Sequence, residues 1–248
     1  MTTRAADAAD ATTAATVAVV LGAGQGMRMG SERNKVFLTL DDRPILAHAV
    51  AAFARAPGID EMLLVAHPRE VAECRKLVAE WALGMVRAVI PGGATRHQSE
   101  WCALNALRAR IEAGRVDIVL IHDGARPFVA PREITAVTHA ARRVGGALLA
   151  LPVDADDVVA AAEADGAVRQ VFSAGRLWRA QTPQAFRARA LLGAYDTAAR
   201  EGYEGTDTAA SFARAGGAVQ VVRGSARNLK ITTPADLALA EALLRTHN

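Results

Sequence analysis

Near its N-terminus the chain reads Val17-Ala-Val-Val-Leu-Gly-Ala-Gly-Gln-Gly-Met-Arg-Met-Gly30, and a lysine, Lys35, follows five residues later. A short apolar run that ends in glycines is typical of a buried strand that opens into a loop whose backbone can approach a ligand closely. The backbone N–H groups of such a loop, together with the positive charges of Arg28 and Lys35, suit a polyphosphate. We therefore predict a phosphate-binding loop after the first strand. The glycines alone would also fit an ordinary strand-to-helix turn.

Two better-known phosphate loops do not fit this stretch. In the dinucleotide-binding pattern G-x-G-x-x-G, the third glycine would fall on Met27 or Met29. The P-loop pattern G-x-x-x-x-G-K-[ST] fails because Lys35 is preceded by Asn34 and followed by Val36. The expected phosphate loop therefore matches neither of these two patterns.

Lysine is rare in this chain. Of 29 Lys+Arg residues, only Lys35, Lys76 and Lys230 are lysine. A lysine kept in an arginine-rich background hints at a need for a compact, flexible point charge. Lys35 and Lys230 lie in predicted ligand loops, whereas Lys76 lies on the polar face of a predicted helix.

Length and composition limit the domain organisation and the partners. With 248 residues and 51% hydrophobic content, we predict one domain over 14–248, preceded by a small, polar, disordered tail over 1–13. No stretch resembles a secretory signal or approaches the roughly 18 to 20 apolar residues that cross a bilayer. Cys74 and Cys102 fall in helical patterns, so we expect reduced thiols and a cytoplasmic protein without a membrane partner. A net charge of +3 and 4% aromatic residues also argue against nucleic acid as a partner.

Apolar runs alternate with helical patterns along most of the chain. This alternation predicts an α/β sandwich with a mostly parallel sheet, in which ligands bind outside the carboxyl ends of the strands. The expected strands are Val17–Leu21, Met62–Ala66, Val86–Ile90, Ile118–Ile121, Ala147–Leu151 and Val219–Val222. Helices are expected to begin near Pro44, Pro68, Gln98, Pro131, Pro183 and Pro234, five of them at a proline that suits the first helical turn.

The loops that follow these strands carry glycine and charge. The loop after Ile90 contains Thr95 and Gln98 in a capping-box pattern, so a helix should begin there with free amides facing the ligand. The segments His122-Asp-Gly-Ala-Arg-Pro127 and Gly224-Ser-Ala-Arg-Asn-Leu-Lys-Ile-Thr232 follow two further strands. Each segment alone could be a structural turn. Their joint placement at one sheet edge favours a ligand site.

Residues 152–179 break the alternation. Two β-capable runs, Val158–Ala162 and Val168–Phe172, flank an Asp165-Gly166 step, which is a strong signal for a hairpin. A two-stranded ribbon outside the main sheet would leave its edges unpaired. We expect it to pack on a second copy of the chain; the alternative is a hairpin folded back on its own domain.

Five motifs taken in order resemble the 2-C-methyl-D-erythritol 4-phosphate cytidylyltransferases of the non-mevalonate isoprenoid pathway. The resemblance covers the chain from about Val17 to the C-terminus, and it implies a Rossmann-like nucleotidyltransferase fold, a three-layer sandwich, and a homodimer held partly by a projecting β-arm. It also implies CTP and a small polyol phosphate as substrates and Mg²⁺ as the cofactor. The motifs are Gly24-x-Gly26-x-Arg28-Met29 with Lys35, Gly92-Gly93 with Arg96 and Ser99, His122 to Pro127, Gln181-Thr-Pro-Gln184, and Asn228-Leu-Lys230-Ile-Thr232.

The same resemblance assigns roles by position. It makes Asp123 the metal ligand and three cations catalytic: Arg28, Lys35 and Lys230. The nucleotide would be held by Gly22, Ala23, Gly24 and Gly26 at the triphosphate and by Gly93, Ala94 and Ser99 at the cytosine. The substrate pocket would include Arg126, Thr182, Asp156 and Arg176.

The chain departs from the family pattern on the acceptor side. The arm reads Asp154-Ala-Asp-Asp157 where the family usually has Asp-Thr after Pro-Val, and Ala174 stands where an arginine is usual. An added carboxylate and a lost cation would weaken binding of the acceptor phosphate, although Arg176 or Arg179 could compensate.

The expected reaction moves CMP from CTP onto 2-C-methyl-D-erythritol 4-phosphate and releases pyrophosphate. The attacking phosphate monoester has a second pKa of about 6, so no general base is needed, and His122 is expected to be packed rather than to bind a metal. Cations and a metal would act by positioning and by electrostatic stabilisation. Two alternatives stay open: a cytidylyltransferase for another polyol phosphate such as ribitol 5-phosphate, and a non-catalytic CTP-binding protein.

Overall fold

A computed structural model describes residues 14–24, 34–81, 83–154, 158–162, 167–173 and 177–245. The expected disordered tail over 1–13 lies outside these ranges. So do Gly26, Arg28, Asp156, Ala174 and Arg176, on which part of the sequence interpretation depends.

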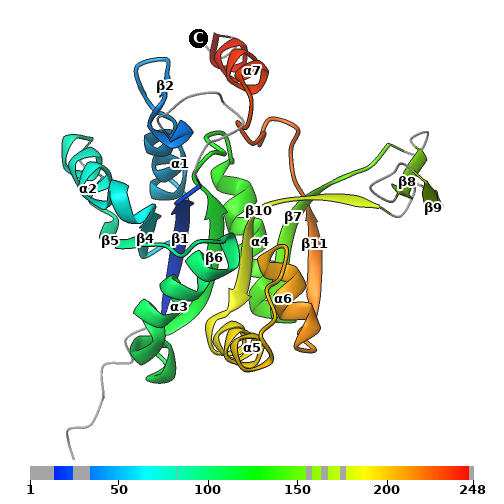
Figure 1. Cartoon of the computed structure of the whole chain (residues 1–248). Helices are drawn as coiled ribbons and strands as arrows, with labels where there is room; N and C mark the ends of the chain where they lie inside the picture. Colours follow the sequence, from blue (N-terminus) through cyan, green and yellow to red (C-terminus); the bar gives the residue numbers. More distant parts are fainter. Residues whose placement is uncertain are drawn as a thin grey trace, which may run out of the picture.

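A seven-stranded sheet forms the centre of the molecule (Figure 1). Its order is β11-β7-β10-β6-β1-β4-β5. Pairing is antiparallel only where β10 meets β6 and β7, so the six other strands all run in one direction. The strands are β1 Ala15–Gly22, β4 Glu61–Ala66, β5 Val86–Pro91, β6 Val116–Asp123, β7 Gly146–Pro152, β10 Trp178–Arg187 and β11 Val219–Arg223. All six predicted strands are present, and the α/β class is confirmed.

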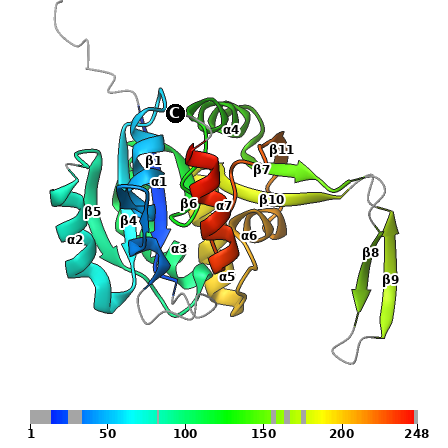
Figure 2. The ribbon, with the colours of Figure 1, turned by 90° about the horizontal axis from the view of Figure 1, so that it is seen from above.

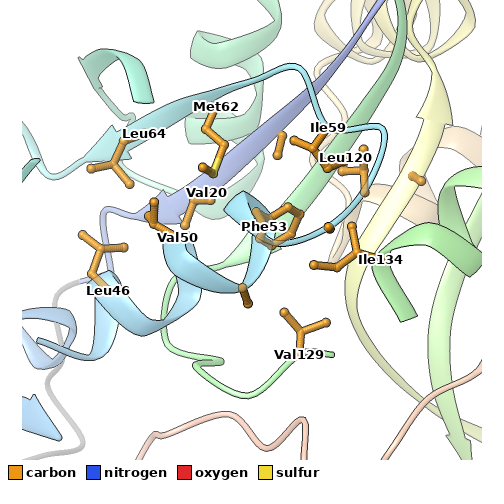
Figure 3. Packing of buried hydrophobic residues seen from close by; sticks show 14 of the residues in the cluster. Val20, Leu46, Val50, Phe53, Ile59, Met62, Leu64, Leu120, Val129 and Ile134 are labelled. Carbon is orange, nitrogen blue, oxygen red and sulfur yellow. The ribbon is translucent and has the colours of Figure 1, made fainter. Parts of the chain in front are cut away.

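Helices cover both faces of the sheet, which makes three layers. On one face, α1 (Ile45–Ala54), α2 (Val71–Glu80) and α4 (Pro131–Val144) pack against one apolar cluster, part of which is shown in Figure 3. On the other face, α3 (Arg96–Glu112), α5 (Ala188–Glu201) and α6 (Thr208–Arg214) pack against a second cluster. Residues Val17–Val20 of β1 are at most 1% exposed. A strand covered on both sides must be apolar at successive positions, which explains the continuous run in the sequence.

Most predicted helix starts are confirmed. Pro131 and Pro234 are the first residues of α4 and α7 (Pro234–Arg245), and Pro44 directly precedes α1. Pro68 begins a short 3-10 turn, η3 (Pro68–Glu70), that leads into α2, and α3 begins two residues before Gln98.

The predicted helix at Pro183 is wrong. Pro183 lies inside β10, and the next helix, α5, begins at Ala188. The pairing of β10 with β7 shifts register between Ala180 and Gln184. A proline is tolerated at such an irregularity because its missing N–H removes no ladder hydrogen bond there.

The C-terminal helix lies over the carboxyl edge of the sheet (Figures 1 and 2). Together with the 3-10 turn η2 (Lys35–Phe37) and the small hairpin of β2 (Thr39–Leu40) and β3 (Arg43–Pro44), it frames that edge. A small apolar cluster joins these parts and contains Leu40, Ile45, Ile231 and Ala240.

The predicted arm stands away from the sheet. Strands β8 (Val158–Ala162) and β9 (Val168–Ser173) form a separate antiparallel pair that projects sideways in both views (Figures 1 and 2). The predicted hairpin is therefore confirmed, although its Asp165-Gly166 turn lies outside the described residues. The alternative, a hairpin folded back on its own domain, is wrong. Within the described ranges, no helix has the length and apolar character needed to cross a bilayer.

Candidate active site

The loops singled out in the sequence meet at one cavity of about 330 Å³. It lies at the carboxyl ends of β1, β5, β6 and β11, the edge where parallel sheets bind ligands. Six parts of the chain line it: the end of β1 and the residues after it (Leu21, Ala23, Gly24), the start of η2 and the residue before it (Asn34, Lys35, Val36), the turn before α3 (Gly93, Ala94, Thr95), the first turn of α3 (Arg96, Ser99), the end of β6 and the turn after it (Asp123, Ala125), and the loop after β11 (Lys230, Thr232). Of the described residues of the predicted site, all line this cavity except Gly22, Arg126 and Thr182.

Asn34 ties together the two ends of the loop that follows β1. Its side-chain amide donates to the Gly22 carbonyl and to Glu70 Oε2, each at 2.8 Å, and its Oδ1 accepts from Val36 N at 3.3 Å. Asn34 is 3% exposed, so these bonds are shielded from water. They place Lys35 at the cavity wall, which the glycine end of the loop also lines. The sequence analysis did not identify this role.

The turn between β5 and α3 is held rigidly by its own hydrogen bonds. Ser99 Oγ accepts from Gly93 N at 3.2 Å and donates to the Thr95 carbonyl at 2.9 Å. Thr95 caps α3 as predicted, since its Oγ1 accepts from Gln98 N at 3.1 Å. The Gln98 side chain accepts from Ala94 N at 3.0 Å rather than from Thr95 N. A Cβ atom at Gly93 would lie 2.4 Å from Gln98 Cβ, so this turn requires glycine.

Asp123 is the anionic centre of the site. Its Oδ1 pairs with Arg96 Nη1, and its Oδ2 lies 3.2 Å from Arg126 Nε and 3.0 Å from Lys230 Nζ. Burial opposes ionisation of the carboxyl, but the Arg96, Lys230 and Arg126 charges outweigh it and hold the pKa of Asp123 well below its usual range. The cavity lining therefore carries one ionised acid, Asp123, and three cations, Lys35, Arg96 and Lys230, so its wall is net positive.

Arg126 and Thr182 lie behind Asp123 and support it, outside the cavity lining. Arg126 Nη1 donates to the Asn228 carbonyl at 2.8 Å, and Thr182 Oγ1 accepts from Asp123 N at 3.0 Å. Asn228 in turn donates to the Thr182 carbonyl at 2.8 Å. These bonds connect β6, β10 and the loop after β11. A direct role for Arg126 or Thr182 in substrate binding stays a prediction.

His122 is packed, as expected, and does not face the cavity. It is fully buried; Nε2 lies 3.1 Å from the Arg126 carbonyl, and Nδ1 lies 3.2 Å from Thr182 Oγ1. Its ring meets the Phe53 ring edge-on at 4.9 Å. Burial lowers the pKa of His122 to about 4, so the imidazole is neutral at physiological pH.

The loop after β11 presents Lys230, and the residues that follow Lys230 hold this loop to the turn after β6 and to α7. Ile231 N donates to the Ala125 carbonyl at 2.9 Å. Asp236, in the first turn of α7, accepts from Thr232 N at 2.8 Å and from Thr233 N at 2.8 Å. The hydrogen bond from the Thr232 hydroxyl, followed by those from the two backbone amides and the Thr233 hydroxyl, lowers the pKa of Asp236 to about 2. Lys230 is 37% exposed, so its ammonium is accessible from the cavity.

The side chains that line the cavity suit a metal ion only if substrate oxygens supply most of its ligands. Among the described residues, no three His, Cys, Asp or Glu side chains gather into a metal-binding group. Asp123 is the single carboxylate among the cavity-lining residues. Magnesium is commonly held by one or two carboxylates with substrate phosphates completing its shell. The residues therefore fit Mg²⁺ that arrives with phosphate oxygens, and they do not fit a metal held by protein alone.

Arg96 and Thr232 are polar residues of the cavity lining that were not predicted as site residues. Arg96 was quoted within a motif but was given no role, although it is the closest partner of Asp123. Thr232 also lines the cavity. Both lie in or directly beside the loops that carry glycine and charge at the carboxyl edge of the sheet. This position could have identified them as site residues.

The sequence profile of the 2-C-methyl-D-erythritol 4-phosphate cytidylyltransferase family matches residues 16–246. The chain belongs to this family. Relatives of that name come from Geotalea uraniireducens (42% identical over 232 residues) and Geobacter metallireducens (43% identical over 233 residues). Each alignment covers 93% of this chain and at least 97% of the relative's own length. The enzyme family is therefore that of nucleotidyltransferases.

Solved structures agree with this assignment. The crystal structure of 2-C-methyl-D-erythritol 4-phosphate cytidylyltransferase from Thermus thermophilus is 35% identical, with a TM-score of 0.71 over 92% of this chain and 98% of that one. That of 4-diphosphocytidyl-2C-methyl-D-erythritol synthase from Anaerococcus prevotii has a TM-score of 0.79 at 26% identity, over 94% and 96%. The expected Rossmann-like nucleotidyltransferase fold is confirmed.

Proposed function

We propose that this enzyme transfers CMP from CTP to 2-C-methyl-D-erythritol 4-phosphate and releases pyrophosphate. Membership of the cytidylyltransferase family supports the reaction. The observation that carries the proposal to this chain's own residues is the cavity that Lys35 and Lys230 line together with the glycine loop and Asp123. A cavity with this net positive wall suits a triphosphate and a second phosphate together.

The chemistry needs positioning and charge rather than a base. The acceptor phosphate is largely ionised at pH 7, since its second pKa is about 6, so it can attack the α-phosphate directly. Two anions must then approach each other, and negative charge spreads over the reacting phosphoryl group as pyrophosphate leaves. Lys35 and Lys230 would stabilise that charge, and Arg28, which lies outside the described residues, would be a third cation in the same role. The neutral, packed His122 has no step to perform.

Asp123 would hold Mg²⁺ together with phosphate oxygens of CTP. When bound, the ion would neutralise phosphate charge and orient the triphosphate. Gly22, Ala23 and Gly24 would contact the triphosphate through their backbone. Gly93, Ala94 and Ser99 would contact the cytosine at the rigid turn before α3.

A specific observation favours a second candidate for the acceptor. The arm reads Asp154-Ala-Asp-Asp157 where the family usually has Asp-Thr after Pro-Val, and Ala174 stands where an arginine is usual. Both changes make the acceptor side more negative. A cytidylyltransferase for another polyol phosphate, such as ribitol 5-phosphate, is therefore the alternative function.

An acceptor assay separates the two functions. Pyrophosphate release from CTP and Mg²⁺ should be measured with each acceptor and with none. We expect release that depends on 2-C-methyl-D-erythritol 4-phosphate, with kcat/KM at least about tenfold above that for ribitol 5-phosphate, a preference of about 1.4 kcal/mol. Turnover with ribitol 5-phosphate alone would replace the proposed acceptor. CTP binding without turnover on any acceptor would make the protein a non-catalytic CTP-binding protein.

We further propose that the enzyme works as a homodimer in the cytoplasm. The projecting β8–β9 arm supports the dimer, because a two-stranded ribbon with exposed Val171 (59%) gains little stability by itself. The two cysteines, of which Cys74 is buried, are both free thiols, in keeping with a reducing compartment.

A further inference from the structure

A buried carboxylate that the proposed reaction does not use lies directly behind the cavity. Glu100, on α3, is 1% exposed. Its Oε1 lies 2.8 Å from Arg96 Nε and accepts from Thr208 Oγ1 at 2.9 Å. Its Oε2 accepts from the Tyr195 hydroxyl. Three elements, α3, α5 and α6, therefore converge on one carboxylate that does not itself line the cavity.

The fold alone does not require this arrangement. Removing a carboxylate from water costs several kcal/mol, and replacing a buried ion pair by well-packed apolar side chains is often neutral or stabilising. Burial raises the pKa of Glu100, while the Arg96 charge acts in the opposite direction. Tyr195 is itself fixed, because its ring stacks on His97 with centroids 4.5 Å apart. Glu100 is thus held firmly, at a cost that packing does not explain.

The consequence for Arg96 is a fixed orientation. Its guanidinium is held from two sides, through Nε by Glu100 and through Nη1 by Asp123. Because the guanidinium is planar, fixing two nitrogens also fixes the third. Nε and Nη2 are both buried, and neither has a hydrogen-bond partner among the described residues, so the contact of Nε with Glu100 is an ion pair. Arg96 lines the cavity, so the orientation that Glu100 and Asp123 impose decides where its positive charge lies at the cavity wall.

We propose that Glu100 is a positioning residue: it holds Arg96 so that Nη1 pairs with Asp123 and the positive charge of the guanidinium faces the nucleotide bound in the cavity. The identity of that ligand rests on the proposed function. Thr208 and Tyr195 act one step further back, by satisfying the remaining lone pairs of Glu100. If the hydroxyl of Thr208 or of Tyr195 were lost, the Glu100 carboxylate could turn away from Arg96.

Glu100→Gln tests the proposal because it keeps the shape and removes the charge. In titration calorimetry with CTP and Mg²⁺, we expect the Kd of CTP to rise at least about tenfold, or about 1.4 kcal/mol. The KM for CTP should rise in parallel, whereas the KM for the acceptor should stay within about twofold. Arg96→Lys should weaken CTP binding as well, because it loses the planar fork. The double variant should bind CTP no more weakly than Arg96→Lys alone, within about twofold, because Glu100 acts through Arg96.

A matched control and a second variant keep the test decisive. Glu133, on α4, is also buried (7% exposed) and accepts from Ala130 N at 2.8 Å, away from the cavity. Glu133→Gln should leave CTP binding unchanged. If Glu100→Gln does not fold, Tyr195→Phe carries the test: it keeps the ring over His97 and loses the hydroxyl, and we expect a smaller rise, about threefold, in the Kd of CTP.

Each outcome has a distinct meaning. Unchanged CTP binding in folded Glu100→Gln, with only a lower Tm, would make Glu100 merely structural and overturn the proposal. If the effects of Glu100→Gln and Arg96→Lys on the Kd of CTP simply add in the double variant, Glu100 does not act through Arg96. That result would also overturn the proposal. Wild-type protein that fails to bind CTP would remove the proposed function itself, and this inference with it.

Discussion

The three lysines of the chain have different surroundings. Lys35 and Lys230 line the cavity, whereas Lys76, on α2, is 76% exposed and pairs with Glu80 at 3.5 Å. We expect Lys35→Ala or Lys230→Ala to lower kcat by about 10²- to 10³-fold, since each removes a charge aimed at the transferred phosphoryl group. Lys76→Ala is the matched control and should keep wild-type rates. Rates near wild type in either cavity variant, measured by pyrophosphate release, would show that its charge does not face the reaction.

Some single residues were predicted because their type was unusual for their place, and the others were assigned through the resemblance to the family. Lys35 and Lys230 were noticed because lysine is rare here, and Asp123 because an acid ended an apolar strand. Asn34 and Glu100 gave no such signal. A polar residue beside a loop or within an amphipathic helix is usually solvated, and only the fold shows that these two are 3% and 1% exposed. Their roles come from contacts with residues far along the chain, such as Glu70 for Asn34 and Thr208 for Glu100.

At the scale of elements, the N-terminus of α7 fixes the loop that presents Lys230. Asp236 accepts hydrogen bonds from the backbone and side chains of Thr232 and Thr233. We expect Asp236→Ala to lower the free energy of unfolding by about 1 kcal/mol, the usual cost of losing a helix cap. The loosened loop should also raise the Kd of CTP. Chemical denaturation and calorimetry would measure the two effects, and unchanged values in both would show that the cap does not support the loop.

The same contact predicts a dependence on pH. The pKa of Asp236 is lowered from 3.8 to about 2 in the folded protein, so the carboxylate stabilises the fold above the unfolded value and loses that contribution as pH falls toward 2. The difference in unfolding free energy between wild type and Asp236→Asn should therefore be constant above about pH 5 and shrink below about pH 4. A difference that persisted unchanged down to the folded-state pKa would contradict this account.

The elements that the sequence predicted correctly are those with local signals. Continuous apolar runs marked the six parallel strands, and proline marked most helix starts. Strand β10 was missed because Gln181-Thr-Pro-Gln184 looks like the start of a helix. What makes it a strand is its place between β6 and β7, where it completes the sheet and brings Thr182 beside Asp123. Pairing between distant segments is a property of the whole fold, and no local sequence pattern predicts it.

At the scale of the whole molecule, the arm forms a two-stranded sheet of its own that is not part of the central sheet. The β8–β9 pair projects from the rest of the domain (Figure 2). It has its own antiparallel pairing, and Val171 is exposed. We expect deletion of residues 158–172 to convert a dimer into a monomer. Sedimentation velocity would show this as a halved mass, with far-UV circular dichroism as the check that the domain is still folded. An unchanged sedimentation profile would rule out the arm as the dimer contact.

The whole account depends on where the nucleotide binds. A crystal structure determined with CTP and Mg²⁺ is the most direct measurement. It should place the triphosphate between the loop after β1 and Lys230, with the metal at Asp123 and the cytosine at the turn before α3. A nucleotide bound elsewhere on the molecule, or a cavity left without one at saturating CTP, would contradict it.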